Sequence, residues 1–196
     1  FWLGKLGSAE VGAPTAAWPV IFSFLAIGMG FSTAGVSLVS QHTGAGGDKR
    51  ANEAAGQVFT FIMIIGVVSG VVGFILAPWI LRLVGTPSNV FPLATSYLRI
   101  VLLSMPFIFA YISFRFLLRG IGDMVTPMLI RAVLVGFNMF LDPILIFGVG
   151  PIPAMGVTGA AIATASARAI SAIVGMYLLF HDRVQIKLSL RDLGLK

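Results

Sequence analysis

Residues 54–81, AAGQVFTFIMIIGVVSGVVGFILAPWIL, contain no charged side chain and are flanked by Glu53 and Arg82. A helix needs about 20 consecutive apolar residues to cross the hydrocarbon core of a bilayer, so this stretch is long enough. It is also continuous, whereas the strands of a transmembrane barrel are about 10 residues long and alternate in polarity. The stretch therefore predicts a membrane-spanning helix and, with it, an all-α integral membrane protein.

The composition of the whole chain also indicates a membrane protein. Hydrophobic residues make up 58% of the chain and charged residues 10%, against about 25% charged residues in soluble domains. The net charge is +6, but the basic residues lie at the ends of apolar stretches and form no stripe of the kind that binds nucleic acid. The chain has no cysteine, which excludes a disulfide framework. It also lacks the zinc, nucleophile-elbow and phosphate-loop motifs, so we predict that it is not an enzyme.

Further apolar stretches predict that the chain forms a helical bundle. Phe1–Gly7 is expected to be the end of an earlier helix. The complete spans are expected at residues 14–40, 55–81, 92–118, 127–147 and 157–180. The predicted fold is therefore an all-α membrane bundle of five complete transmembrane helices plus the end of a sixth.

The basic residues of the loops predict the orientation of this bundle. The loops at 43–50 and 119–126 and the tail at 183–196 carry or adjoin several Lys and Arg residues, whereas the connections between them carry few. Because basic loops remain in the cytoplasm, we expect these three segments on the cytoplasmic face of a multi-pass plasma-membrane protein. The tail is expected either to lie at the membrane surface or to form a loose connection.

Asp142 is the most informative residue for function. A carboxylate at membrane depth costs roughly 2.5–3.5 kcal/mol on insertion scales. Asn138 precedes it by four residues and shares its helix face, and Pro143 cannot donate a hydrogen bond to the carbonyl of Met139. Such oxygens suit Na⁺, and a desolvated carboxylate can bind H⁺ instead. The alternative is that Asp142-Pro143 only ends a helix near the membrane surface.

The next predicted span contains residues that could add to this site. Ala160 and Thr164 are four residues apart, and the hydroxyl of Thr164 could supply another oxygen, although a helical threonine can also bond to its own preceding turn. Arg168 lies deeper in a span and is expected to face protein or water, where it could pair with a carboxylate outside this sequence. Arg131 is expected to extend toward the cytoplasmic surface.

Several motifs resemble those of the multidrug and toxic compound extrusion (MATE) transporters. Leu118–Pro127 resembles their RGxGDxxxP connection, and Asn138–Pro143 resembles the NxxxDP segment of their fifth helix. Gly156–Thr164 resembles the GxxGAAxAT opening of their sixth helix. Val39–Ala45 is similar to the end of their second helix, and Phe1–Gly7 to the exit of their first. The resemblance follows the chain in order over nearly its whole length.

This resemblance implies one lobe of a two-lobed transporter with twelve helices. Residues 1–182 would be the N-terminal lobe, from the end of helix 1 through helix 6, and residues 183–196 the linker to the C-terminal lobe. The implied activity is antiport, in which H⁺ or Na⁺ drives the export of small organic compounds, in particular cationic drugs. No cofactor is implied.

The resemblance also implies where the coupling cation binds. The site would include a first-helix Asp one or two residues before Phe1, and Pro143 would act as a hinge when the cation binds. Within this sequence, the expected H⁺ or Na⁺ site consists of Asp142, Asn138 and Thr164, with Ala160 beside them and the backbone carbonyl of Met139.

Two other functions remain open on the sequence. A lipid-linked oligosaccharide flippase of the same superfamily needs a cationic lumen for a pyrophosphate, and a cavity lined by Arg131 and Arg168 rather than by Asp142 would favour it. A non-transporting membrane subunit that assembles as a half-size dimer is the other alternative.

Overall fold

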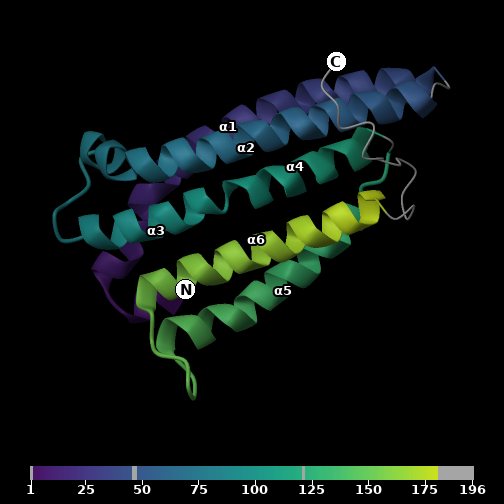
Figure 1. Cartoon of the computed structure of the whole chain (residues 1–196). Helices are drawn as coiled ribbons and strands as arrows, with labels where there is room; N and C mark the ends of the chain where they lie inside the picture. The colour runs from purple at the N-terminus through teal and green to yellow at the C-terminus, as the bar shows by residue number, and fades with distance from the viewer. Residues whose placement is uncertain (1, 46–47, 121, 181–196) are drawn as a thin grey trace.

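The computed structural model describes residues 2–45, 48–120 and 122–180, which form a bundle of long helices with short connections (Figure 1). No strand occurs in these residues, in agreement with the predicted all-α class. The elements are the 3₁₀ turn η1 (Trp2–Lys5) and the helices α1 (Ser8–Gly44), α2 (Asp48–Leu83), α3 (Phe91–Leu103), α4 (Met105–Gly120), α5 (Val125–Phe147) and α6 (Gly156–Phe180).

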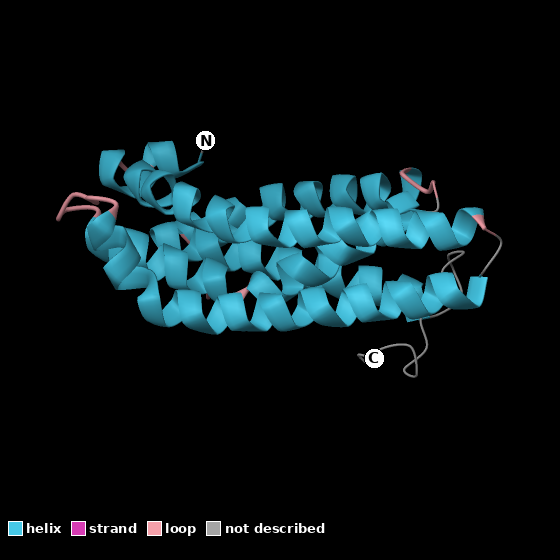
Figure 2. Ribbon diagram, turned by 90° about the horizontal axis from the view of Figure 1, so that it is seen from above, coloured by secondary structure: helices cyan, strands magenta, loops and turns pink. Residues whose placement is uncertain are grey.

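The helices account for the predicted membrane spans. Of the described residues, α1, α2, α5 and α6 are each long and apolar enough to cross a membrane, and α3 with α4 gives a fifth span when the bent pair is counted as one. Viewed from above, the helices run along one common long axis (Figure 2). The number of complete spans predicted from the sequence is therefore confirmed.

The third span differs from the prediction, because it is not one continuous helix over residues 92–118. The chain bends by 49° between α3 and α4, where Ser104 donates a side-chain hydrogen bond to the carbonyl of Val101 at 2.7 Å. Pro106 lacks the N–H that would continue the helical ladder, and a proline also disfavours helical geometry at the residue before it, Met105. The bend therefore follows from Pro106.

Two further bounds differ from the prediction. The residues expected to end an earlier helix form only the short 3₁₀ turn η1, and α1 begins at Ser8, so that Pro14 and Pro19 lie inside it. Helix α2 begins at Asp48, several residues before the apolar stretch. Hydropathy indicates the part of a helix that lies in hydrocarbon, whereas the helix itself continues into the interfacial region.

Glycines allow the first helices to pack closely on α4. Phe109 of α4 is completely buried, and a Cβ placed on Gly28 of α1 would overlap its ring. A Cβ on Gly66 of α2 would lie 3.0 Å from the Cβ of Phe109. Small residues serve the same purpose in other membrane bundles, where packing replaces the hydrophobic driving force between helices. Phe109 therefore holds α1, α2 and α4 together.

The connections of the bundle fall at two ends. Figure 1 places the α1–α2 connection, the α4–α5 connection and the end of α6 together at one end. The hydroxyl of Ser40 near the end of α1 donates a hydrogen bond to the carbonyl of Gly120 at 3.1 Å, which joins the first two of these connections. The basic loops predicted to be cytoplasmic are thus at the same end. The predicted linker at 183–196 lies outside the described residues, and the division at 182 stays a prediction.

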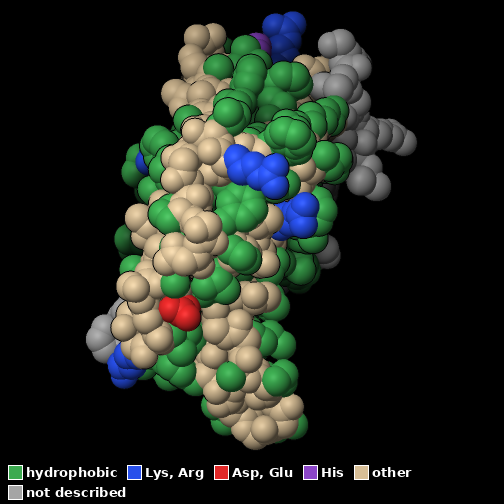
Figure 3. Space-filling view, turned by 90° about the vertical axis from the view of Figure 1, so that its left-hand side faces the viewer, with side chains coloured by type: hydrophobic (Ala, Val, Ile, Leu, Met, Phe, Trp, Pro, Cys, Tyr) green, Lys and Arg blue, Asp and Glu red, His purple; other side chains and the backbone are tan. Residues whose placement is uncertain are grey.

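The outer surface is largely apolar, as expected for a protein surrounded by lipid. On the face shown in Figure 3, hydrophobic side chains predominate and charged side chains are few. Trp79 and Ile75 on α2 and Val133 and Phe140 on α5 are among the exposed large hydrophobic residues.

Candidate functional site

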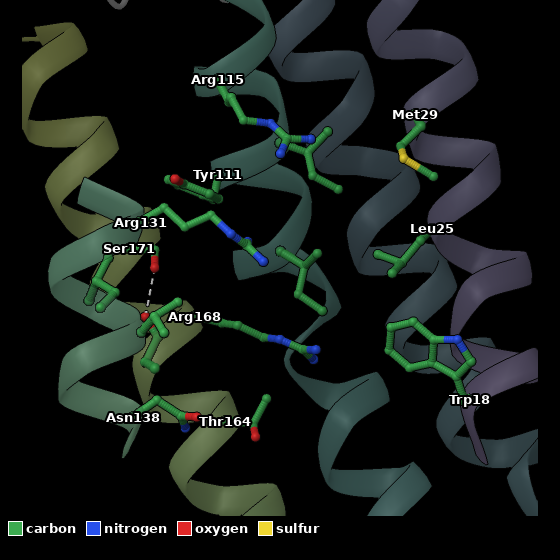
Figure 4. A pocket seen from close by; sticks show the side chains of 15 residues that line it. Trp18, Leu25, Met29, Tyr111, Arg115, Arg131, Asn138, Thr164, Arg168 and Ser171 are labelled. Carbon is green, nitrogen blue, oxygen red and sulfur yellow. Dashed lines mark hydrogen bonds between the residues drawn. The ribbon is translucent and has the colours of Figure 1, made fainter. Parts of the chain in front are cut away.

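A cavity of about 340 Å³ lies between α1, α4, α5 and α6. Figure 4 shows the side chains that surround it. Its lining consists of Trp18, Leu25 and Met29 from α1, Ile108, Tyr111, Ile112 and Arg115 from α4, Arg131, Leu134, Val135 and Asn138 from α5, and Thr164, Ala167, Arg168 and Ser171 from α6.

Three arginines dominate the electrostatics of this cavity. Arg115, Arg131 and Arg168 come from three different helices, and in Figure 4 the side chains of Arg131 and Arg168 extend into the space opposite α1. No carboxylate among the described residues forms an ion pair with these three side chains, and the buried Nη1 of Arg168 has no hydrogen-bond partner. Buried polar groups in native proteins nearly always have partners. Within the described part of the chain, the cavity therefore presents cationic donors without anionic partners.

The wall opposite the arginines is different in character. Trp18, Leu25 and Met29 line it from α1 (Figure 4). Tyr111 lies on the arginine side, where its hydroxyl donates a hydrogen bond to the carbonyl of Pro127 at 3.0 Å. This bond fixes α4 to the beginning of α5. The cavity thus combines an apolar wall with a polar wall, the usual arrangement of small-molecule sites.

The Asn138–Asp142 pair lies on α5 beside this cavity. The side-chain amide of Asn138 donates a hydrogen bond to Oδ1 of Asp142 at 3.3 Å, so the two side chains meet on one helix face. Asn138 lines the cavity, whereas Asp142 is half-buried and does not. The carboxylate is therefore linked to the cavity through Asn138.

The other predicted site residues lie nearby on α5 and α6. Thr164 lines the cavity together with Asn138 (Figure 4), and Ala160, one turn before Thr164, is buried. Pro143 is inside α5, so its missing N–H leaves the carbonyl of Met139 without that helical donor. A carboxylate, an amide, a hydroxyl and a carbonyl are the oxygen donors that suit a hard cation.

A glycine allows α5 and α6 to approach each other at this site. A Cβ added to Gly159 of α6 would collide with the carbonyl of Leu145 on α5. The same carbonyl accepts a hydrogen bond at 3.0 Å from the N–H of Met155, in the connection between the two helices. Gly159 therefore sets the spacing of the two helices that carry Asn138, Asp142 and Thr164.

Asp123 of the RGxGDxxxP motif caps the start of α5. Its Oδ1 accepts hydrogen bonds from the N–H groups of Thr126 at 3.0 Å and Val125 at 3.1 Å. The pKa of the Asp123 carboxyl lies below its usual range, chiefly because of the bond from the backbone of Thr126, then because of one from the Thr126 hydroxyl, and to a smaller extent because of the bond from Val125. The motif therefore has a structural role at the beginning of the helix that carries Asn138 and Asp142.

Sequence reasoning missed part of this arrangement. Arg131 was expected to extend toward the membrane surface, but its side chain points into the cavity (Figure 4). Arg115 and Trp18 were not predicted to be functional. The sequence showed only a charged or aromatic residue within or near an apolar stretch, which does not show that the packing of α1 and α4 brings these two residues to one cavity. Arg168 was expected to face protein or water, and it lines the cavity.

The chain resembles known transporters in sequence and in structure. It matches the family model MatE over residues 1–144. It is 36% identical over 159 residues to the probable multidrug resistance protein YoeA of Bacillus subtilis, and this alignment covers 81% of this chain and 34% of that protein. It is also 31% identical over 184 residues to the FAD transporter of Shewanella oneidensis, and this alignment covers 91% of this chain and 40% of that protein.

A solved structure has the same fold. It is that of a MOP superfamily transporter from Pyrococcus furiosus, for which a reverse polarity of the binding pocket is said to suggest a different function. It aligns with a TM-score of 0.90 at 27% identity, covering 100% of this chain and 42% of that one. The chain belongs to the MATE family of multi-pass membrane transporters, and its fold is that of one lobe. It spans between 34% and 42% of the length of these three proteins.

Proposed function

We propose that this chain is the N-terminal lobe of a cation-coupled exporter of drugs or other toxic organic compounds, and that it acts with a C-terminal lobe in the plasma membrane. The observation that carries the proposal is the placement of Asn138 and Thr164 in the lining of the cavity, with Asp142 hydrogen-bonded to Asn138. A cation that binds there would lie directly beside the compound to be exported. The predicted cytoplasmic position of the basic loops is part of this proposal.

The proposed coupling works through the charge of Asp142. When H⁺ or Na⁺ binds, the carboxylate no longer carries an unbalanced charge, and its hydrogen bond with Asn138 changes. Asn138 lines the cavity, so the change reaches the bound compound. Pro143 is the proposed hinge, because a helix bends most easily where its hydrogen-bond ladder is interrupted. The oxygen donors suit either ion, so H⁺ and Na⁺ remain alternatives.

The test uses the complete transporter in proteoliposomes with an imposed H⁺ or Na⁺ gradient. Asp142→Asn keeps the shape of the side chain but cannot titrate, and it should lower gradient-driven export of an organic dye at least tenfold. Glu53→Gln, at the polar beginning of α2, removes a carboxylate outside the site and should leave export unchanged. If Asp142→Asn still exports the dye in response to the gradient, the proposal is wrong.

A second candidate function is the transport of an anionic, lipid-linked compound. Arg131 and Arg168 line the cavity and Asp142 does not, which is the arrangement expected for a flippase of the same superfamily. One relative also supports an anionic cargo, namely the Shewanella oneidensis protein named as an FAD transporter, since FAD carries phosphate groups. Cationic drugs, expected from the resemblance, are disfavoured by the same three arginines. Substrate charge therefore has to be tested separately from coupling.

A further inference from the structure

The cavity charge is concentrated on one side, and no carboxylate among the described residues pairs with it. Arg115, Arg131 and Arg168 lie on the wall formed by α4, α5 and α6 (Figure 4). Charged side chains at membrane depth are expensive, and they normally pair with each other or mark a substrate pathway. Because these three have no carboxylate partner among the described residues, their charge has to be balanced from outside this part of the chain, and a bound anionic ligand would balance it.

Arg168 is the clearest indication of such a ligand. Its Nη1 is buried and makes no hydrogen bond within the described part of the chain. A guanidinium group presents its donors as a planar fork that matches the two oxygens of a carboxylate or phosphate. An anionic group in the cavity would supply the acceptor that the described residues do not.

The arginines also continue from the cavity toward one end of the bundle. A second hollow of about 180 Å³ lies at the α4–α5 connection, and Arg115 and Arg131 line both it and the main cavity. Arg119 adds a further positive charge to this second hollow and Asp123 adds one negative charge, so positive charge is in excess there. An excess of charge of one sign raises the local concentration of an oppositely charged ligand. An anion thus has a basic route from the end of the bundle to the cavity.

The opposite wall indicates what the rest of the ligand is like. Trp18, Leu25 and Met29 face the arginines across the cavity (Figure 4). A volume of about 340 Å³ is within the usual range for small-molecule sites, and this lobe forms only one side of the proposed transporter. The apolar wall suits an aromatic ring or a short apolar segment rather than a bare inorganic ion.

We propose that this cavity binds an organic anion, whose carboxylate or phosphate group pairs with Arg131 and Arg168 and whose apolar part packs against Trp18. This inference rests on the proposed transport function and specifies its substrate class. Arg115 supports the site by adding positive charge beside the route of entry. The anion is either a soluble compound or the head group of a lipid-linked one, since both present the same chemistry to the arginines.

The test compares two dyes that share a xanthene ring system but carry opposite charges. The complete transporter in nanodiscs is titrated by fluorescence anisotropy with fluorescein, a dianion at about pH 8, and with the cation rhodamine 123. Fluorescein should bind at least tenfold more tightly. Arg168→Gln and Arg131→Gln should each weaken fluorescein binding at least tenfold and leave rhodamine 123 binding no weaker. Arg82→Gln, which removes an exposed arginine at the end of α2, is the matched control and should change neither.

The outcomes separate this inference from the proposed coupling. Binding is measured without an ion gradient, so a failure of Asp142-dependent export does not change the binding result. A failure of fluorescein to bind likewise leaves the proposed role of Asp142 in coupling unaffected. Displacement of fluorescein by a soluble organic phosphate such as FAD, and not by a polyprenyl pyrophosphate within the nanodisc, indicates a soluble cargo; displacement by the polyprenyl pyrophosphate alone indicates a lipid-linked one. Tighter binding of rhodamine 123, or unchanged fluorescein binding in both arginine variants, overturns the proposal.

Discussion

Gly159→Ala should separate α5 from α6, because the added methyl group has no space to occupy. The new Cβ would lie 2.6 Å from the carbonyl carbon of Leu145, whereas ordinary contacts begin at 3.4 Å. Because the carbonyl oxygen of Leu145 is nearer still, the helices would have to move apart by at least about 0.8 Å, the difference between these distances. Neither atom belongs to a side chain that can rotate away, and the Leu145 carbonyl is also held by its hydrogen bond from Met155.

The expected loss of stability follows from this displacement. A gap of 0.5–1 Å removes about a quarter to a half of the dispersion energy of each contact along the seam. Overpacking in a rigid site costs typically about 1–3 kcal/mol. We expect Gly159→Ala to lower the unfolding free energy by an amount in the upper half of that range, because the added methyl group meets the backbone of α5.

The measurement is the unfolding free energy of the chain in mixed micelles, titrated with SDS and followed by tryptophan fluorescence. Gly136→Ala on α5 is the matched control, because a Cβ there meets no atom within 4 Å. It should change the unfolding free energy by no more than about 0.5 kcal/mol, or raise it slightly through better helix propensity. Equal stability of the two variants would show that α6 does not rest on the Leu145 carbonyl.

Two further predictions concern the core and the start of α5. Phe109→Ala should lower the unfolding free energy by about 3–5 kcal/mol, because it empties the space between Gly28 and Gly66; Phe140→Ala, at a side chain 77% exposed, should change it by less than about 1 kcal/mol. Asp123→Ala should lower the unfolding free energy by about 0.5–1 kcal/mol at pH 7. This is at the lower end for the loss of a helix cap, because solvent screens the carboxylate. The pKa of Asp123 is lowered in the folded state, so this contribution is complete above about pH 4 and is lost as the pH falls further. The difference between wild type and Asp123→Ala in SDS titrations should therefore shrink at about pH 3, and a constant difference would contradict the role of the charged cap.

The fold was largely predictable because the bilayer imposes a strong constraint on sequence. The uncharged run between Glu53 and Arg82 can only be a helix, and the same argument located the other spans. The break at Ser104 was not predicted, although Pro106 was visible, because many membrane helices tolerate a proline when their neighbours satisfy the freed backbone groups. Whether a helix bends or breaks at such a position depends on its packing.

The candidate site was predictable only where it lies within one helix. A spacing of four residues was enough to place Asn138 and Asp142 on one face, and their hydrogen bond agrees with it. The cation-binding role of these residues stays a prediction. Arg115, Arg131 and Arg168 are far apart in the sequence, and their convergence depends on how α4, α5 and α6 pack. No local pattern contains that information.

The arginine-lined wall also bears on the energy source of transport. Exchange of an organic monocation for one entering cation moves no net charge, so the membrane potential contributes nothing. Export of a dianion against one entering cation moves three charges in the direction favoured by a negative cell interior, worth about 7 kcal/mol at 100 mV. A tenfold cation gradient supplies only about 1.4 kcal/mol. For the proposed anionic cargo, the voltage across the membrane would therefore drive export more strongly than the coupling-ion gradient itself.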